Sequence, residues 1–183
     1  MLRETQRRLA LLAIVAIVAV AWTAGFKGTG VPPVATASAA ANPKAATVAH
    51  LVRCPFPTTL RSAFEKASAD AAIPPAMLWA VAKVESNLHA DAESSAGARG
   101  LLQVMPATAR ALDLNVDEPS SNVLAGARYL RQMLDRFHSS DLALAAYNAG
   151  PTAVTIAGGA PSVDVQRYVF NVTRLWHSVA GCR

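Results

Sequence analysis

The chain has 183 residues, which is enough for one domain and a shorter additional segment but not for two full domains. It is 52% hydrophobic and 16% charged, and this composition excludes a disordered protein. The net charge is +5, but residues 42–183 contribute only +2; most of the excess lies beside the first apolar run and gives little support to nucleic-acid binding.

The N-terminal segment, residues 1–41, has the features of an export signal. Three arginines precede an apolar run over residues 9–22, and Ala-x-Ala sequences follow within residues 37–41. This pattern is typical of a secretory signal peptide. Because the cleavage sequences lie well beyond the apolar run, an uncleaved signal anchor is the alternative. Either one predicts an exported protein of the periplasm or cell envelope, soluble after cleavage or anchored by this segment.

Residues 42–53 are predicted to be a linker that precedes a globular domain over residues 54–183, because large apolar residues are scarce before that point. Cys54 and Cys182 flank this domain. In an oxidising compartment such a pair predicts a disulfide, with two free buried thiols as the alternative. The four histidines are scattered, with no ligand spacing among them or the cysteines, so neither a metal ion nor a cofactor is predicted.

Apolar residues at helical spacing predict an all-α domain with six or seven short helices and no convincing strand. The predicted helices cover residues 60–72, a segment that starts at 74–75, residues 106–112, a long segment to about 137, residues 141–149, a short segment ending near 158 and residues 163–179. The long helix is predicted to be capped by Ser121 or Asn122, and the one after it by Asp141.

The second predicted helix carries a carboxylate on its apolar face. Leu78, Val81 and Ala82 define this face, and Glu85 follows on the same side one turn later. An ionised carboxylate is costly to bury, so Glu85 must be paired, protonated or in a cleft. Burial raises a carboxyl pKa toward the range that a general acid needs near neutral pH. From spacing alone, a structural ion pair or a solvated edge position is the alternative interpretation.

Four sequence blocks and a Tyr168-Val169 pair follow one another in an order typical of a known family. The blocks are residues 73–86 with Glu85-Ser86, residues 94–106, residues 122–130 and residues 146–151. Over residues 73 to about 172 the chain resembles the lytic transglycosylase family of the soluble (SLT) type. The resemblance implies a lysozyme-like helical domain of the goose type with a catalytic groove.

The resemblance also implies a chemistry and a set of site residues. The family's catalytic acid falls on Glu85, which would protonate the β-1,4 bond between N-acetylmuramic acid (MurNAc) and N-acetylglucosamine (GlcNAc) in peptidoglycan. The muramic 6-hydroxyl would then attack its own anomeric carbon and return a proton to Glu85, giving a 1,6-anhydro end. One carboxylate suffices for this reaction, whereas a standard glycosidase needs two. The family's substrate-binding residues fall on Ser94, Gln103, Met105, Tyr147, Asn148 and Tyr168.

Two positions depart from the family pattern. Leu102 stands where the family usually has Met, a change that preserves volume. Asp164-Val165 stands where the family usually has Glu-Thr, which predicts that a hydrogen-bond partner of the site is weakened or displaced. Ser86, next to the acid, is predicted to bond backbone at the end of its helix.

Alternatives from other functional classes remain at this point. A muramidase would use water on the same fold, and a non-catalytic wall-binding component of an envelope-spanning apparatus would have no need of an acid at Glu85. The predicted partner is the glycan strand of peptidoglycan, with an envelope secretion or conjugation apparatus as a second partner by analogy alone. No nucleic acid is expected, and a membrane only through the N-terminal segment.

Overall fold

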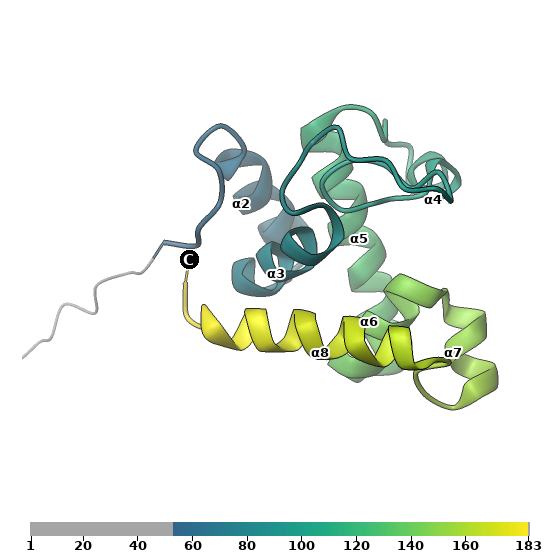
Figure 1. Ribbon diagram of the computed structural model, residues 1–183. Helices are drawn as coiled ribbons and strands as arrows, with labels where there is room; N and C mark the ends of the chain where they lie inside the picture. The colour runs from purple at the N-terminus through teal and green to yellow at the C-terminus, as the bar shows by residue number, and fades with distance from the viewer. Residues whose placement is uncertain (1–52, 183) are drawn as a thin grey trace, which may run out of the picture. The chain divides into compact units, whose positions relative to one another are not determined.

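The computed structural model describes residues 53–182 (Figure 1). The predicted export segment and nearly all of the predicted linker lie outside the described residues, so these interpretations stay predictions. Helices account for the regular structure: α2 (Arg61–Asp70), α3 (Pro75–Ser86), α4 (Pro106–Ala111), α5 (Pro119–Phe137), α6 (Ser140–Ala149), α7 (Pro151–Ala157) and α8 (Val163–Ser178). The only β structure within residues 53–182 is a pair of isolated bridges around Arg99, which confirms the all-α prediction.

None of the helices within residues 53–182 is both long enough and apolar enough to cross a membrane.

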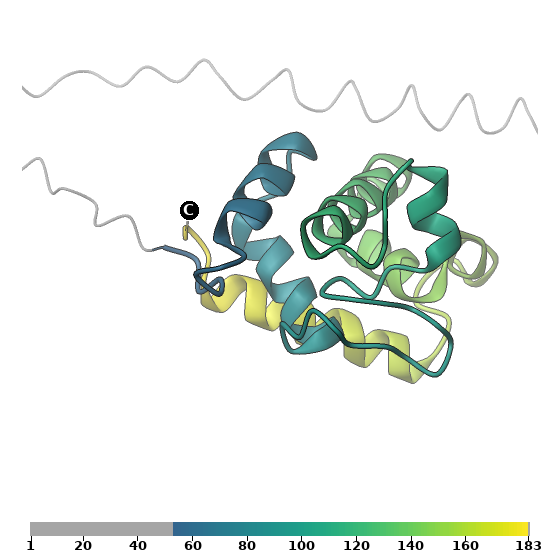
Figure 2. The ribbon, with the colours of Figure 1, turned by 90° about the horizontal axis from the view of Figure 1, so that it is seen from above.

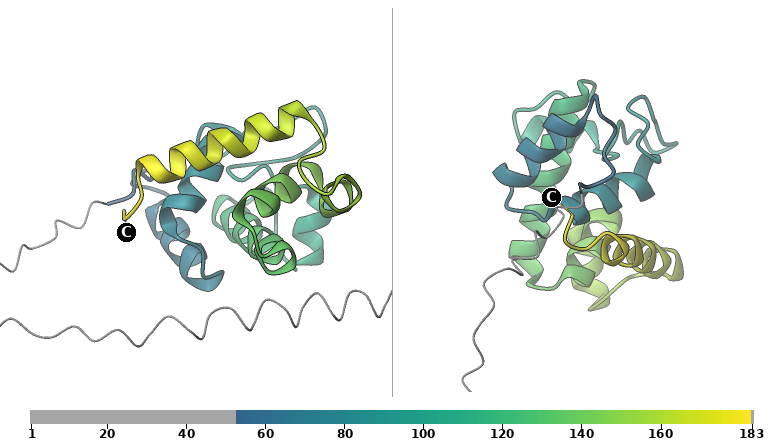
Figure 3. Two further views of the ribbon diagram at one scale, coloured as in Figure 1. Left: turned by 90° about the horizontal axis from the view of Figure 1, so that it is seen from below. Right: turned by 90° about the vertical axis from the view of Figure 1, so that its left-hand side faces the viewer.

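Helix α3 is surrounded by other elements. It packs against α2 on one side and α8 on another, while α5 packs against α2 and α6. Figure 2 and the left view of Figure 3 show α8 crossing α3, with the segment that connects α3 to α4 beside it. Residues 76–82 of α3 are all buried, which requires an apolar surface on every side of the helix. Glu85 lies three residues beyond this buried stretch and is itself half-buried.

The starts of the helices differ from the sequence prediction in two places. Helix α5 begins at Pro119, and the Glu118 carboxylate caps it by accepting hydrogen bonds from the backbone N–H groups of Ser120 and Ser121. The prediction that Ser121 or Asn122 caps this helix is therefore wrong. Helix α6 is capped by Ser139, so the prediction for Asp141 is also wrong; Asp141 lies in the first turn, where a negative charge favours the helix dipole.

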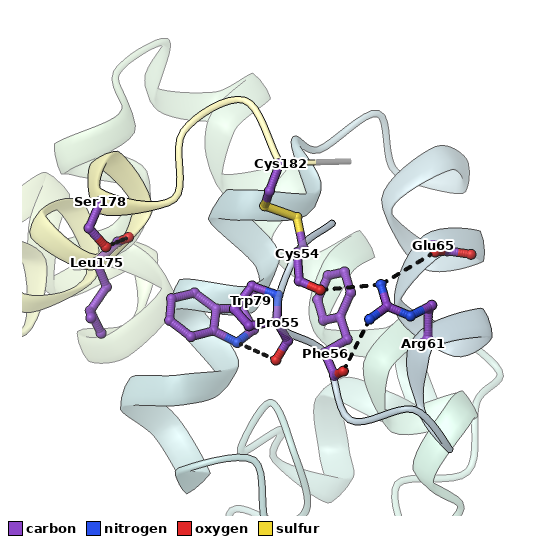
Figure 4. The surroundings of a disulfide bond; sticks show 9 residues. All are labelled: Cys54, Pro55, Phe56, Arg61, Glu65, Trp79, Leu175, Ser178 and Cys182. Atoms are coloured by element: carbon purple, nitrogen blue, oxygen red, sulfur yellow. Dashed lines mark hydrogen bonds and ion pairs between the residues drawn. A yellow bond between two sulfur atoms is a disulfide. The ribbon is translucent and has the colours of Figure 1, made fainter. Parts of the chain in front are cut away.

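A disulfide joins Cys54 to Cys182, as predicted, with the two Cα atoms 4.8 Å apart (Figure 4). It ties the segment before α2 to the segment after α8. The Trp79 indole N–H on α3 donates to the Pro55 carbonyl over 3.1 Å, and the Arg61 guanidinium donates to the Cys54 carbonyl over 3.2 Å. Both ends of the described segment are thus fastened to α2 and α3, with both cysteines buried.

Candidate active site

Glu85 meets a tyrosine from a distant part of the chain. It is the second-last residue of α3, and the packing of α8 across α3 brings Tyr168 to it. The Tyr168 hydroxyl donates a hydrogen bond of 2.7 Å to Glu85 Oε1. The tyrosine is buried, and burial together with the Glu85 charge raises its pKa well above the usual value. Tyr168 therefore stays protonated and acts as the donor in this pair.

The surroundings of Glu85 raise the pKa of its carboxyl to near neutral pH. Burial raises the pKa of the carboxyl to about 7, and the hydrogen bond from Tyr168 acts against this shift. A group with this pKa is present in both protonation states at neutral pH, which suits it to give a proton and later take one. Among residues 53–182, no other carboxylate contributes to the shift.

The backbone turn at residues 99–104, here called the 99–104 turn, is held beside this pair by two helices. The Ser86 hydroxyl, next to the acid in α3, donates to the Leu101 carbonyl over 2.8 Å, which confirms the prediction that it bonds backbone. The Tyr147 hydroxyl on α6 donates to the Leu102 carbonyl over 2.7 Å. Burial and the nearby Glu85 charge raise the pKa of Tyr147, so this hydroxyl also remains a donor.

Asn122 provides a third attachment from α5. Its side-chain oxygen accepts from the Leu102 N–H over 3.0 Å, and its side-chain nitrogen donates to the carbonyls of Arg99 over 2.8 Å and Val116 over 3.0 Å. Sequence reasoning missed this role because asparagine near a predicted helix start is a common cap. Its spacing of four residues from Gly126 and eight from the core residue Leu130 places Asn122 on the buried side of this helix, and this spacing could have indicated a role in the interior.

Gly126 allows α5 to approach the 99–104 turn closely. A Cβ atom at this position would lie 2.4 Å from Leu102 Cβ and 2.9 Å from the Tyr147 hydroxyl oxygen. Neither distance is compatible with ordinary packing. Glycine is therefore required here for Tyr147 to reach the turn, a second role that the sequence prediction did not include.

The remaining predicted substrate-binding residues lie on the segment around this turn and on α6. The side-chain nitrogen of Gln103 donates to the carbonyls of Ala92 (3.0 Å) and Gly100 (2.9 Å). The Ser94 hydroxyl accepts from the Ala98 N–H. Met105 precedes α4 and is 43% exposed, and Asn148 is exposed on α6. Of all the predicted site residues, Tyr168 is the one that hydrogen-bonds Glu85 within residues 53–182.

Two further carboxylates, Glu93 after α3 and Asp164 on α8, form ion pairs of their own. Glu93 lies 3.7 Å from the Arg99 guanidinium, which also pairs with Asp117 at 3.0 Å. Asp164, at the position that departs from the family pattern, is exposed and pairs with Arg167 over 3.1 Å. No group of three metal-ligating side chains is gathered anywhere in residues 53–182.

Comparison with known proteins places this geometry in a family. A family model described as the transglycosylase SLT domain matches residues 62–162, just over half of the chain. The transglycosylase of Enterobacteria phage PRD1 is 40% identical over 85 residues, covering 46% of this chain and 32% of the phage protein. The membrane-bound lytic murein transglycosylase F of Cellvibrio japonicus is 39% identical over 110 residues, covering 51% of this chain and 22% of that protein.

Solved structures agree with this relationship. The 70 kDa soluble lytic transglycosylase of Escherichia coli superposes with a TM-score of 0.59 at 27% identity, covering 66% of this chain and 24% of that one. An inactive mutant of the lytic transglycosylase Slt of Pseudomonas aeruginosa gives a TM-score of 0.60 at 26% identity, over 70% of this chain and 25% of that one. The chain spans a third or less of the length of these relatives. On the match of the family model to more than half of its residues, the chain belongs to the transglycosylase SLT domain family.

Proposed function

We propose that this protein is a peptidoglycan lytic transglycosylase that cleaves the MurNAc-β-1,4-GlcNAc bond, with Glu85 as its acid and then its base. The observation that carries the proposal is the half-buried Glu85 carboxyl, whose pKa is raised to about 7 by desolvation and which accepts a hydrogen bond from a tyrosine on one oxygen. Membership of the transglycosylase SLT domain family supports the same reaction class.

The first step needs the protonated form of Glu85. Its proton goes to the glycosidic oxygen as the bond to the muramic anomeric carbon breaks, so that the GlcNAc side leaves with a hydroxyl group. Near neutral pH about half of the carboxyl groups carry this proton, because the pKa lies at about 7. The Tyr168 hydrogen bond to Oε1 orients the carboxyl and leaves the other oxygen for proton transfer.

The second step uses the carboxylate that the first step leaves. The muramic 6-hydroxyl forms a bond to its own anomeric carbon, and its proton returns to Glu85. No water is consumed and the enzyme regains its starting state. A hydrolase of the usual type places a second carboxylate at about 5–9.5 Å from the acid. The proposed step needs no such second carboxylate, because the nucleophile is a hydroxyl of the substrate itself.

The glycan strand is proposed to contact the residues predicted from the family blocks: Ser94, Gln103, Met105, Tyr147, Asn148 and Tyr168. The exposed Met105 side chain offers an apolar surface for a sugar face. The carbonyl oxygen of the Gln103 side chain is available for a sugar hydroxyl, because only its nitrogen is bonded to the backbone. The disulfide supports a location outside the cytoplasm, since such bonds persist in oxidising compartments.

The test is mass spectrometry of the fragments that the purified protein releases from peptidoglycan. We expect products that end in 1,6-anhydro-MurNAc, one water lighter than reducing ends. Glu85→Gln is expected to lower turnover by at least about a thousandfold, whereas Glu93→Gln, an exposed acid on the neighbouring segment, keeps it. Reducing ends would identify a muramidase, and retained turnover in Glu85→Gln would exclude the mechanism. Wall binding without any product would identify a binding module.

A further inference from the structure

The segment after α3 contains a small hairpin, residues 93–99, here called the 93–99 hairpin. Its two ends, Glu93 and Arg99, face each other in an antiparallel bridge, and the Ser94 N–H donates to the Ala98 carbonyl over 2.9 Å. Within the described part of the chain, the first six residues of the hairpin form hydrogen bonds and ion pairs only inside it. None of its residues belongs to a hydrophobic cluster, so apolar packing does not fix its orientation.

The side chain of Arg99 connects this hairpin to the segment before α5. Its Nη1 atom donates to both carboxylate oxygens of Asp117, over 3.0 and 3.3 Å. Its Nε atom lies 3.7 Å from the Glu93 carboxylate, in an ion pair that stays inside the hairpin. The three side chains line a polar cavity of about 350 Å³. Among the described residues, the Arg99–Asp117 pair is the one link that a hairpin side chain makes outside the hairpin.

Ser94 is the hairpin residue for which contact with the glycan strand is predicted. Its hydroxyl oxygen accepts a hydrogen bond from the Ala98 N–H over 3.0 Å. A serine hydroxyl also has one proton to donate, and no acceptor within residues 53–182 receives it, so a sugar oxygen can do so. The direction in which this proton is offered depends on the orientation of the 93–99 hairpin. A tie at Arg99 therefore acts on this contact without touching the strand.

We propose that the Arg99–Asp117 ion pair holds the 93–99 hairpin, and with it the Ser94 hydroxyl, in position for the glycan strand. Arg99 and Asp117 are positioning residues, because they act through the hairpin. The inference rests on the proposed function, since the glycan strand is the ligand. The side chains of Arg99 and Asp117 are 41% and 61% exposed, so salt screens their attraction. The contribution of the pair to glycan binding is therefore largest at low salt.

The test measures the binding of solubilised, uncross-linked peptidoglycan strands by calorimetry, with Glu85→Gln as the parent protein so that the strands stay intact. Adding Asp117→Asn is expected to weaken binding about two- to fivefold, the range for a partly exposed ion pair. Arg99→Lys keeps the positive charge and is expected to lose less affinity than Arg99→Gln. Glu93→Gln is the matched control, because it removes a carboxylate beside the same guanidinium, but one that moves with the hairpin. It is expected to bind like the parent.

Salt distinguishes positioning by this ion pair from a general loss of structure. Raising the NaCl concentration from about 0.05 M to about 0.5 M is expected to reduce the difference in affinity between the parent and Asp117→Asn, because screening weakens only a pair that is present. Three results would overturn the assignment: binding by Asp117→Asn as tight as by the parent, an equal loss of affinity in Glu93→Gln, or a loss that is independent of salt and accompanied by a lower melting temperature.

The proposed function is tested separately, by assaying 1,6-anhydro products from the chain with its native Glu85. If these products are absent while Asp117→Asn, and not Glu93→Gln, weakens strand binding, the proposed function is refuted and the assignment of the ion pair stands. If the products form and all variants bind strands equally, the assignment of the ion pair alone is refuted.

Discussion

The Glu85–Tyr168 contact and the 99–104 turn are neighbouring regions that are held in opposite ways. Glu85 has one side-chain hydrogen bond, from Tyr168, and its burial is left largely uncompensated, so its pKa rises to about 7. The 99–104 turn receives hydrogen bonds from Ser86, Asn122 and Tyr147, which lie on three different helices. The Glu85–Tyr168 contact leaves the carboxyl able to gain and lose a proton near neutral pH. The hydrogen bonds to the 99–104 turn fix the conformation of its backbone.

The comparison distinguishes a residue that changes its protonation, Glu85, from residues that hold the backbone of the 99–104 turn. A carboxyl can change its protonation at neutral pH only if few partners stabilise its charged form. A turn without regular secondary structure keeps one conformation only if its backbone groups are satisfied. Substitutions in the two regions are therefore expected to affect different properties: stability for the turn, and pH dependence for the acid.

The largest effect on stability is expected for Gly126→Ala. The added methyl group would meet Leu102 at 2.4 Å, and the fully buried surroundings leave little room to relax. Overpacking of this kind costs about 1–3 kcal/mol of unfolding free energy, and we expect the upper end. Chemical denaturation measures it. Gly159→Ala is the control, because no atom lies within 4 Å of its added methyl group. Equal losses of unfolding free energy in the two variants would show that Gly126 is not required for the close approach of α5 to the 99–104 turn.

A slightly smaller loss is expected for Asn122→Ala. The variant leaves the Leu102 N–H and the Val116 carbonyl without the partner that Asn122 provides, while the Arg99 carbonyl keeps its bond from the Val104 N–H. Unsatisfied buried groups cost about 1–3 kcal/mol, and we expect about 2 kcal/mol in denaturant unfolding. Tyr147→Phe, which removes a single bond to the turn, is expected to cost about 1 kcal/mol. If Tyr147→Phe costs more than Asn122→Ala, α6 and not α5 is the main support of the turn.

Glu85→Gln is expected to change how stability depends on pH. The folded-state pKa of Glu85 is raised from 4.5 to about 7, so the folded protein binds more protons than the unfolded chain between these values. Its stability therefore falls as the pH rises through this window. The rise in pKa from 4.5 to about 7 corresponds to about 3 kcal/mol at most. Glutamine does not titrate, and because Glu85 is only half-buried we expect Glu85→Gln to gain about 2 kcal/mol relative to wild type between pH 4.5 and 7.5. If the difference in unfolding free energy between Glu85→Gln and wild type stays constant over this pH range, the raised pKa is contradicted.

The smallest effect is expected for Tyr168→Phe. Its hydroxyl stabilises the Glu85 carboxylate, so its removal raises the pKa of that carboxyl further. The basic limb of the pH–activity profile should move upward by about half a unit to one unit. Tyr147→Phe is the control, because its hydroxyl bonds the Leu102 carbonyl and not the acid. A shift of equal size in both variants would show that the two regions are not independent.

Several features of this protein follow from short-range patterns. The all-α class is predicted correctly because the period of apolar residues reflects burial along each helix. The disulfide is predicted because two cysteines at the ends of a domain that is expected to be exported have one possible pairing. The caps of α5 and α6 are predicted wrongly, since several polar residues near each start were suitable and local preference alone did not choose among them.

The sequence by itself determined the helices and the cysteine pair, because each depends on neighbours within a few turns or on composition. Only the tertiary structure decided which groups meet. Tyr168 reaches Glu85 across 83 positions of the chain, and Asn122 reaches Leu102 across 20. The pKa of about 7 at Glu85 depends on burial by other helices and on that one donor. Such a value is a property of the assembled surroundings, and no pattern along the chain records it.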